Sequence, residues 1–581
     1  MITISSSDHI QVEQHFKVTA GPGAGKTHWL VNHMKNTVKN SLRLEKTRKI
    51  ACITYTNIAV ETIFKRLGTN MANRVEVSTI HSFLYKHVIK PYLFLIADEF
   101  EVNIEKINGH DTVLPRRATV ENWLENHSRK TDLKHPNSVK QLQFIEDKKN
   151  SLWVWLSNLE YKFDSDGHLK LVGKKDKAGF ISKVAEILED DLISYKKLSW
   201  ARGKIDHDDV LFFSYVLITR NPFILKVLRA KFPYFFLDEV QDTNPIQSRI
   251  VKLIAEEETI VGVIGDPAQS IYAFQGANIE EFTNFRLGNM AEYRILENRR
   301  SSNQIIDLLN IVRNDIVQEK YKNVDEDVPI LFIGDTIDAY KRIKDLYGEN
   351  TVIHTLSRDN SRANSMKSMV SLNGLDSKLL IKFQESDSNP DRPRIIINSI
   401  ESVEFARIGD YKNALEKMKA LFIGLSEKDQ VNKSIALLQM LLSEYSNYES
   451  KAIMEFYNIL KTHISMAGFK AGAAKDFYNT NSYKHLSICI NFKEDISDHR
   501  TIHKAKGDEF ENVLLIPNSL DFLINPDLEN DEEHRIYYVG LSRAESRLFI
   551  VFPKLIKKHQ KLIEEKYKIK VEDLSKIPEL V

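Results

Sequence analysis

Short runs of β-branched and aromatic residues recur along the chain, and each ends abruptly in a polar or glycine-containing turn. Examples are residues 16–19, 234–237 and 260–264, which are followed by Ala20, Asp238 and Gly265. Apolar runs of this length, bounded by turn residues, are typical of strands that are buried within an α/β sheet. The pattern therefore predicts polar groups gathered where buried strands end.

Longer segments place apolar residues three and four positions apart, which favours helices. Residues 91–199 and about 376–484 have this character, with examples at 414–425 and 434–448. Strands are expected again at 330–333 and 352–355, outside these segments. The sequence thus predicts two α/β regions, each interrupted by a largely helical insertion.

The turn after the first run is rich in glycine and leads directly into a helical pattern. It reads Ala20-Gly21-Pro22-Gly23-Ala24-Gly25-Lys26-Thr27. Strand, glycine-rich turn and helix form a cradle whose backbone N–H groups face phosphate oxygens. Lys26 can reach the β- and γ-phosphates, and Thr27 offers a hydroxyl to Mg²⁺. The cradle predicts a nucleotide site, although its first position is Ala20 where the strict pattern has glycine.

Two adjacent carboxylates, Asp238 and Glu239, follow the run at 234–237. Loops at the carboxyl ends of α/β strands carry ligands. Asp238 is expected to hold Mg²⁺ through water, and Glu239 to polarise the water that attacks the γ-phosphate.

The segment 265–277 combines polar and aromatic chemistry in one loop. Gln269 could contact a phosphate or its attacking water. Tyr272 and Phe274 offer flat surfaces on which a nucleobase can stack. The loop predicts a link between nucleotide state and nucleic-acid binding.

Hydrolysis also requires positive charge where negative charge develops. Arg300 and Arg543 are the candidates, and both lie far along the chain from the cradle. We expect them to come from a second domain.

Composition limits the class of protein and the compartment that we expect. The 581 residues suffice for several domains, and 81 basic against 80 acidic residues give a net charge of +1, which argues against a wholly basic nucleic-acid-binding protein. The two cysteines, Cys52 and Cys489, exclude a disulfide framework and a cysteine-based zinc site and favour a reducing cytoplasm. Neither a signal segment at the amino terminus nor an apolar run long enough to cross a bilayer is seen, so we expect no membrane association.

The order of these motifs resembles the superfamily 1A helicases of the UvrD, PcrA and Rep type. Besides the segments above, the resemblance rests on residues 53–61, 78–83, 205–211, 298–301, 501–510 and 537–544. It implies two RecA-like P-loop motor domains with parallel sheets flanked by helices. It also implies ATP and Mg²⁺ as cofactors, and single-stranded or tailed DNA as substrate.

The resemblance assigns further roles. Gly21, Gly23, Ala24 and Gly25 belong to the nucleotide site with Lys26 and Thr27. Gln269, Arg300 and Arg543 resemble γ-phosphate sensors and arginine fingers, and Glu509 stands where the family contacts the ribose. The expected DNA contacts are aromatic at Tyr55, Tyr272 and Phe274 and polar at Thr56, Asn57, Thr79 and His81; core packing is the alternative for Tyr55 and His81.

Three positions depart from the family pattern. Arg299 replaces the tyrosine that usually stacks on adenine, the glutamine-bearing helix before the cradle is hard to place, and Phe274 replaces a tryptophan. A guanidinium can stack on a base. The first two departures predict loose recognition of adenine, so that GTP or deoxynucleotides are also used. The third keeps a stacking surface but makes it smaller.

The motifs divide the chain into expected domains. The first motor comprises 1–90 and 200–293 around an insertion at 91–199, in which Trp153 and Trp155 are expected in the core rather than as a DNA wedge. The second motor comprises 294–375 and 485–581 around a reduced insertion at 376–484. It ends in a lysine-rich tail that we expect to be a solvated helix face rather than a DNA contact. We expect no nuclease domain after Arg543.

Three functional hypotheses follow. The first is an ATP-driven, 3′-to-5′ DNA translocase and helicase. The second resembles the helicase-like subunit of Gabija-type anti-phage systems, a DNA-sensing NTPase acting beside a separate nuclease of the overlapping-lysogenization-defect type, with little unwinding. The third is RNA as the substrate, because a stacking surface accepts either nucleic acid.

Overall fold

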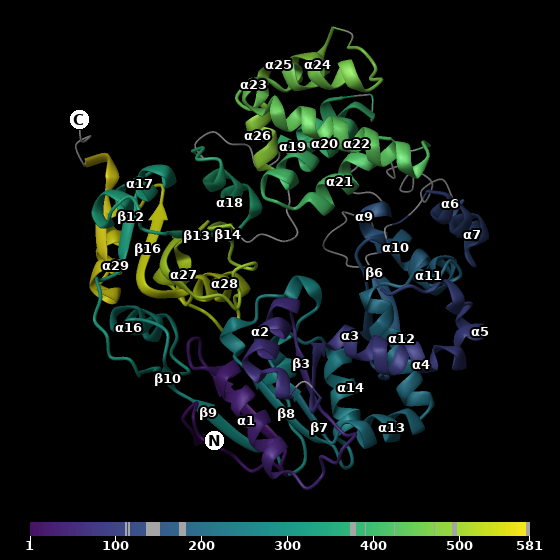
Figure 1. Cartoon of the computed structure of the whole chain (residues 1–581), viewed down its shortest axis with the longest axis vertical. Helices are drawn as coiled ribbons and strands as arrows, with labels where there is room; N and C mark the ends of the chain where they lie inside the picture. Colours follow the sequence, from purple (N-terminus) through teal and green to yellow (C-terminus); the bar gives the residue numbers. More distant parts are fainter. Residues whose placement is uncertain are drawn as a thin grey trace. The chain divides into compact units, whose positions relative to one another are not determined.

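A computed structural model describes residues 1–71, 73–110, 113, 115, 117–134, 152–173, 182–371, 379–387, 389, 391–422, 424–469, 471–490 and 497–576. The chain divides into two compact units, Met1–Glu297 and Asn298–Val581. Each unit is built on its own sheet, and the two sheets are coloured purple to teal and teal to yellow in Figure 1.

The first unit contains a seven-stranded sheet in which every described pair is parallel. The strands, in spatial order, are β1 (Ile2–Thr3), β9 (Ala291–Ile295), β2 (Phe16–Ala20), β8 (Ile260–Gly265), β7 (Tyr234–Leu237), β3 (Ile50–Thr54) and β4 (Val75–Thr79). Strands β2, β7 and β8 fall on the runs expected from the sequence. Because all strands point the same way, their carboxyl ends form a single edge of the sheet.

Helices cover both faces of this sheet, as a parallel sheet requires. Trp29 of α1 (Lys26–Asn40) is fully buried against Phe16 and Val18 on one face. On the other face lie α12 (His207–Arg220) and α14 (Pro245–Ala255) (Figure 1). Their Phe213 and Ile250 belong to a second core that extends into the insertion. The other helices of this unit are α2 (Asn57–Leu67), α3 (Ile80–Leu84), α4 (Lys90–Tyr92), α5 (Ala97–Phe100), α6 (Arg117–Asn126), α7 (Lys130–Leu133), α9 (Leu152–Leu156), α10 (Ser182–Glu189), α11 (Leu192–Trp200), α13 (Phe223–Lys231) and α15 (Ile279–Thr283).

The insertion of the first unit is helical, as expected, but it also holds an antiparallel hairpin. The hairpin joins β5 (Leu159–Phe163) to β6 (Leu169–Gly173). Trp155 is buried against Gly173, where a Cβ would lie 2.0 Å from the indole nitrogen, so the glycine makes room for the ring. The expectation that Trp155 belongs to the core is confirmed, and the side chain of Trp153 lies outside the described residues.

The second unit contains a six-stranded sheet, again parallel in every described pair. Its spatial order is β14 (His499–Thr501), β13 (His354–Ser357), β15 (Phe510–Ile516), β16 (Ala544–Phe552), β12 (Ile330–Ile333) and β17 (Lys570–Asp573). The expected strand at 330–333 is confirmed, and the one expected at 352–355 begins two residues later. The two-sheet α/β fold class is therefore confirmed.

The insertion of the second unit is a helical body with its own apolar core. The helix expected over 414–425 ends at Lys419 in α21 (Tyr411–Lys419). The one expected over 434–448 is divided by Glu444 into α22 (Glu427–Ser443) and α23 (Tyr445–Tyr448). The remaining elements of the second unit are β11 (Glu319–Lys320), which pairs with β10 (Glu297–Asn298) at the boundary between the units, and α16 (Asn303–Val312), α17 (Thr336–Tyr347), α18 (Asn360–Lys367), α19 (Leu379–Ser386), α20 (Asp391–Arg407), α24 (Ile453–His463), α25 (Ala473–Thr480), α26 (Tyr483–Ile488), α27 (Asp521–Ile524), α28 (Glu532–Leu541) and α29 (Lys557–Tyr567).

The lysine-rich end of the chain is part of the fold. Ile563 and Tyr567 of α29 are buried, and β17 adds a parallel strand beside β12 at the sheet edge. Its lysines, such as Lys557 and Lys561, lie on the surface, which agrees with a solvated helix face. The strand was not foreseen, because its sequence is more charged than apolar.

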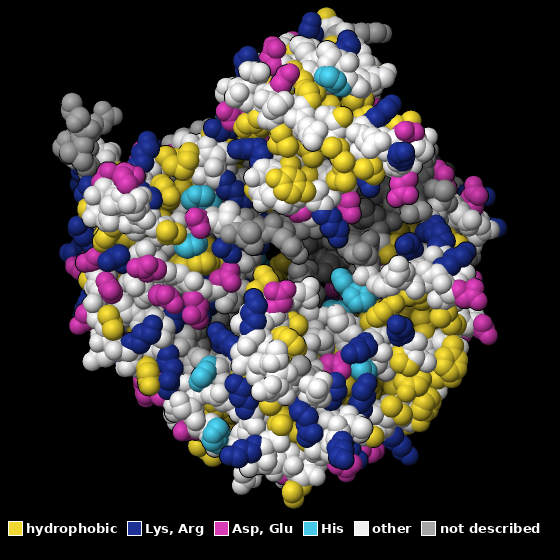
Figure 2. Space-filling model, viewed as in Figure 1, with side chains coloured by type: hydrophobic (Ala, Val, Ile, Leu, Met, Phe, Trp, Pro, Cys, Tyr) yellow, Lys and Arg dark blue, Asp and Glu magenta, His cyan; other side chains and the backbone are white. Residues whose placement is uncertain are grey.

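Apolar side chains are also exposed on the first unit, over α4 and α13 (Figure 2). Phe94 and Leu95 in the turn after α4, and Phe223 and Val227 of α13, are each more than 40% exposed. Within the described ranges, no individual helix has both the length and the apolar composition to cross a bilayer; α12 and α13 satisfy that test only as a pair bent by 106°.

Candidate functional site: an ordered row of loops at the sheet edge

The predicted site residues of the first unit follow five neighbouring strands of one sheet. The phosphate cradle follows β2, the loop 265–277 follows β8, and Asp238 follows β7. Tyr55 follows β3, and Thr79 ends β4. Along this edge the strands that carry predicted nucleotide residues come first and β3 and β4, which carry only predicted DNA contacts, come next; the loop after β8 carries predicted contacts of both kinds.

The cradle has the backbone geometry that phosphate binding requires. Gly23 and Gly25 adopt φ of 72° and 77°, a left-handed conformation that residues with a Cβ disfavour. Gly25 also caps the amino end of α1, where backbone N–H groups lack helical partners. Lys26 is 9% exposed, and its Nζ lies 3.3 Å from the carbonyl oxygen of Ala20 and 3.5 Å from that of Gly21. The Lys26 side chain therefore already lies against the glycine-rich turn that is predicted to bind phosphate.

Asp238 faces the cradle from β7. Its buried carboxylate accepts a hydrogen bond from the Thr27 hydroxyl. Burial and the neighbouring Glu239 raise the pKa of Asp238 well above its usual range, while Lys26 opposes the shift. A buried carboxylate with a hydroxyl beside it is an oxygen donor set suited to Mg²⁺.

Glu239 is held in an unusual backbone conformation, with φ of 55° and ψ of 43°. Its carboxylate accepts a hydrogen bond from the Nε2 of Gln241. Non-glycine residues in this region are uncommon and concentrate at functional sites. The strained turn places Glu239 immediately after the Mg²⁺ candidate Asp238.

Gln241 is a site residue that the sequence reasoning missed. It is fully buried, and its Oε1 accepts the backbone N–H of Asp266 at 3.0 Å while its Nε2 reaches Glu239. The Ser270 hydroxyl donates to the Gln241 carbonyl at 2.9 Å. Gln241 therefore connects the carboxylate loop to the loop 265–277. Its place beside Asp238 and Glu239 was the available signal.

Gln269 lies in the same network. It is 3% exposed, and its Nε2 donates to the Asp266 carboxylate at 2.5 Å. Its amide is thus fixed within the loop that carries Tyr272 and Phe274, between the strands that hold the cradle and Asp238.

The predicted aromatic residues lie together, with Tyr55 and Tyr272 stacked and the Phe274 ring tilted by 52° against Tyr272. The rings of Tyr55 and Tyr272 lie 4.8 Å apart with an interplanar angle of 26°, and Phe274 lies 5.9 Å from Tyr272. The Tyr55 hydroxyl donates to Gln275. Tyr272 is 8% exposed, whereas Phe274 is 48% exposed. The ring that is open to a base is therefore Phe274, and Tyr272 supports it from within.

The polar DNA candidates lie at two helix starts on the same edge. Thr56 caps α2 by accepting the Ala59 N–H at 3.2 Å, and Asn57 is exposed beside it. Thr79 caps α3 by accepting the Ser82 N–H at 3.3 Å. Burial, with the rings of His207 and His110, lowers the pKa of His81 to about 3, so this imidazole is neutral.

The second unit brings its two predicted arginines together, although they are distant in sequence. Arg300 donates to the Ser542 carbonyl at 2.7 Å and pairs with Glu509 at 2.5 Å. Arg543 is 2% exposed and donates to the carbonyls of Val539 and Asp508. Glu509 and Arg543 immediately precede β15 and β16, so this cluster lies at the amino ends of adjacent parallel strands.

Arg299 has an aromatic partner that the sequence did not indicate. Its guanidinium lies 3.7 Å from the centroid of the Tyr321 ring, and that tyrosine is 53% exposed. Tyr321 follows β11 and donates its backbone N–H to the Asn298 carbonyl. The pairing of β10 with β11 thus sets the arginine and the ring side by side.

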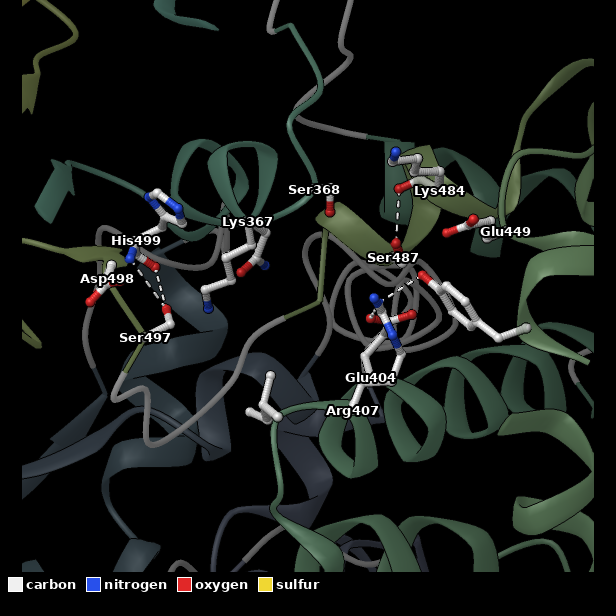
Figure 3. A pocket seen from close by; sticks show the side chains of 13 residues that line it. Lys367, Ser368, Glu404, Arg407, Glu449, Lys484, Ser487, Ser497, Asp498 and His499 are labelled. Carbon is white, nitrogen blue, oxygen red and sulfur yellow. Dashed lines mark hydrogen bonds and ion pairs between the residues drawn. The ribbon is translucent and has the colours of Figure 1, made fainter. Parts of the chain in front are cut away.

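A separate cavity of 620 Å³ lies where the second sheet meets its helical insertion (Figure 3). Lys367, Arg407 and Lys484 line it, but so do Glu404, Glu449 and Asp498. Arg407 pairs with Glu404 at 2.7 Å and donates to Tyr445. The balanced charge does not favour an anionic ligand.

Family comparisons agree with this arrangement. Residues 5–288 match the UvrD/REP helicase N-terminal domain, and residues 283–554 match the UvrD-like helicase C-terminal domain. The two matches together span nearly the whole chain in the expected order.

The chain belongs to the UvrD-like helicases.

Similar curated proteins point the same way. The UvrD-like chain is 24% identical to the ATP-dependent DNA helicase Rep of Buchnera aphidicola, over 92% of this chain and 88% of that protein. It is 24% identical to a probable DNA helicase II homologue of Mycoplasma genitalium, over 92% and 82%. It is 22% identical to the DNA helicase PcrA of Staphylococcus aureus, over 92% and 80%. By family this UvrD-like chain is an ATP-dependent DNA helicase.

Proposed function

We propose that the protein is a 3′-to-5′ DNA translocase and helicase that couples ATP hydrolysis to movement along single-stranded DNA. The carrying observation is the order of loops at the carboxyl edge of the first sheet. The loop 265–277 follows β8, between the cradle on β2 and Asp238 on β7, yet its Tyr272 stacks on Tyr55 beyond β3. One loop thus touches both the nucleotide side and the DNA side.

The nucleotide chemistry is assigned to residues of both units. Gly21, Gly23, Ala24 and Gly25 bind the phosphates, Lys26 neutralises the γ-phosphate, and Thr27 and Asp238 hold Mg²⁺. Bound Mg²⁺ neutralises charge on the β- and γ-phosphate oxygens. Glu239 orients the attacking water and accepts its proton. Gln269, Arg300 and Arg543 sense and stabilise the charge of the leaving phosphate, and Arg299 and Glu509 contact the base and ribose.

DNA is assigned to the other half of the edge. Phe274 stacks on a base, Tyr55 and Tyr272 support it, and Thr56, Asn57, Thr79 and His81 contact the backbone. A change at Gln269 or Glu239 reaches Phe274 through Gln241 and Asp266, which are hydrogen-bonded to one another. This network is the physical route by which hydrolysis would alter stacking.

The decisive experiment measures DNA-stimulated ATP hydrolysis by Glu239→Gln and Lys26→Ala. Loss of the water-orienting carboxylate or of the phosphate lysine removes transition-state stabilisation, and we expect at least about a hundredfold lower kcat. Lys39→Ala, on the exposed side of the last turn of α1, is the matched control and should retain full turnover. Retained turnover in Glu239→Gln would refute the assigned site.

The second candidate is a DNA-sensing NTPase that assists a separate nuclease in anti-phage defence. The observation that favours it is the base site, where Arg299 stacks on Tyr321 in place of the family tyrosine. Strand displacement on 3′-tailed DNA separates the two functions. Displacement supports the helicase, whereas strong DNA-stimulated hydrolysis without displacement supports the sensor. Comparing the stimulation of ATP hydrolysis by single-stranded DNA with that by single-stranded RNA decides which nucleic acid is the substrate.

A further inference from the structure

Three histidines from separate segments of the first unit lie against one another beside the DNA candidates. His81 is in the first turn of α3, His207 begins α12, and His110 is in the loop after Gly109. Their ring centroids are 4.7 Å (His110–His207), 5.1 Å (His81–His207) and 6.4 Å (His81–His110) apart. The nucleotide site and the aromatic stack do not use His110 or His207.

These separations fit three ligands of one metal ion. Imidazole nitrogens bind Zn²⁺ at about 2.0–2.1 Å, and tetrahedral geometry then places the ring centres about 5 Å apart. Two of the observed separations are close to that value, and the third exceeds it by an amount that side-chain rotation can close. The histidine side chains must rotate before they can share one ion. Among the described residues, the ligand atoms that already lie within 4.8 Å of one another are those of Asp164, Asp166 and His168.

The surroundings support this assignment. His207 is exposed and can turn without disturbing the core, while the loop of His110 is fixed by a hydrogen bond from the Gly109 N–H to the Tyr85 hydroxyl at 3.0 Å.

We propose that His81, His110 and His207 form a binding site for a transition-metal ion of the Zn²⁺ class, with one coordination position left for solvent. Three protein ligands and one open position are the pattern of accessible zinc sites. The acidic turn at Asp164 is a weaker candidate, because its carboxylate already accepts the N–H groups of Asp166 and His168 and pairs with Lys170.

The test titrates Zn²⁺ into the full-length protein without a polyhistidine tag, by calorimetry against a competing chelator. We expect one bound Zn²⁺, and we expect His110→Asn and His207→Asn each to weaken binding at least about tenfold. His168→Asn is the matched control and should leave affinity within twofold. Equal affinity in His207→Asn and the parent protein, or loss of binding in His168→Asn alone, would overturn the proposal.

A spectroscopic readout keeps this test independent of the proposed helicase activity. Co²⁺ bound by three imidazoles and solvent gives intense visible absorption typical of tetrahedral coordination, and this absorption should disappear in the double variant His110→Asn/His207→Asn. Near-ultraviolet circular dichroism confirms that the variant is folded. Since His81 is also a DNA candidate, Zn²⁺ should weaken single-stranded DNA binding by the parent and not by the double variant. That last readout alone rests on the proposed function.

Discussion

The two units use opposite edges of the same kind of sheet. In the first, the phosphate cradle and Asp238 follow strands β2 and β7 at the carboxyl edge. In the second, Glu509 and Arg543 precede β15 and β16 at the amino edge. The predicted nucleotide residues therefore follow strands of the first sheet but precede strands of the second.

The two groups of predicted nucleotide residues also differ in the interactions that position them. The first depends on backbone conformation, with Gly25 and Glu239 in left-handed regions and Gln241 bound to main-chain groups. The second depends on side chains, with Arg300 paired to Glu509 and Arg543 bonded to three neighbours. Residues that are positioned by backbone conformation are fixed by the fold. The guanidinium groups of Arg300 and Arg543, in contrast, can exchange hydrogen-bond partners when a negatively charged phosphate binds.

The largest effect is expected in the second unit. Arg300→Ala should lower kcat for DNA-stimulated ATP hydrolysis about a thousandfold, because an arginine finger acts on transition-state charge. Nucleotide affinity should change only a few-fold, in contrast to Lys26→Ala, which should also lose binding. Steady-state kinetics with fluorescent-nucleotide binding measures both quantities. The control is Lys322→Ala, because the Lys322 Nζ donates a hydrogen bond to the Arg300 carbonyl. An unchanged kcat in Arg300→Ala would contradict a role for the second unit in hydrolysis.

The next effect tests the backbone-built half. In Gly265→Ala the new Cβ would lie 2.5 Å from the Oε1 of Gln241, so the link between Glu239 and Asp266 must shift. We expect a loss of about 1–3 kcal/mol in the free energy of unfolding, measured by urea denaturation. Gly288→Ala has open space around its Cβ and is the control. If both variants are equally stable, the close approach at Gly265 is not important.

A smaller effect is expected at the exposed ring of the aromatic stack. Phe274→Ala should weaken single-stranded DNA binding about tenfold, within the 1–3 kcal/mol typical of base stacking. Phe274→Trp should retain binding, because it keeps a flat surface. Fluorescence anisotropy measures the affinity, with Phe94→Ala, which removes another exposed ring, as control. Unaltered binding by Phe274→Ala would place the DNA elsewhere.

The smallest effect concerns base selectivity in the second unit. Arg299→Tyr should shift the ratio of kcat/KM for ATP over GTP by about two- to fivefold, since a cation–π contact at an exposed site is worth about 0.5–1 kcal/mol. Tyr321→Ala should change the same ratio, because it removes the ring that holds the guanidinium. Steady-state assays with the two nucleotides suffice. Identical ratios in all three proteins would show that this pair does not read the base.

Much of the first unit could be predicted because its signals are local. A strand, a glycine-rich turn and a helix lie within one stretch around Lys26, and Asp238 follows an unmistakable apolar run. The insertion was less predictable. Its hairpin β5–β6 has polar and apolar residues mixed along both strands, so its pairing is decided by packing rather than by pattern. The strand β17 was missed for the same reason.

The sequence by itself determined the family and the two-sheet fold, and it supplied the nucleotide residues that we propose, because strict local geometry around phosphate leaves a short, recognisable pattern. Only the tertiary structure decided that Gln241 links two loops, that Phe274 rather than Tyr272 is the open ring, and that Tyr321 lies under Arg299. It alone brought His81, His110 and His207 together. These contacts join residues from separate strands and helices, and a chain's local pattern carries no record of which distant side chains will meet when its sheets form.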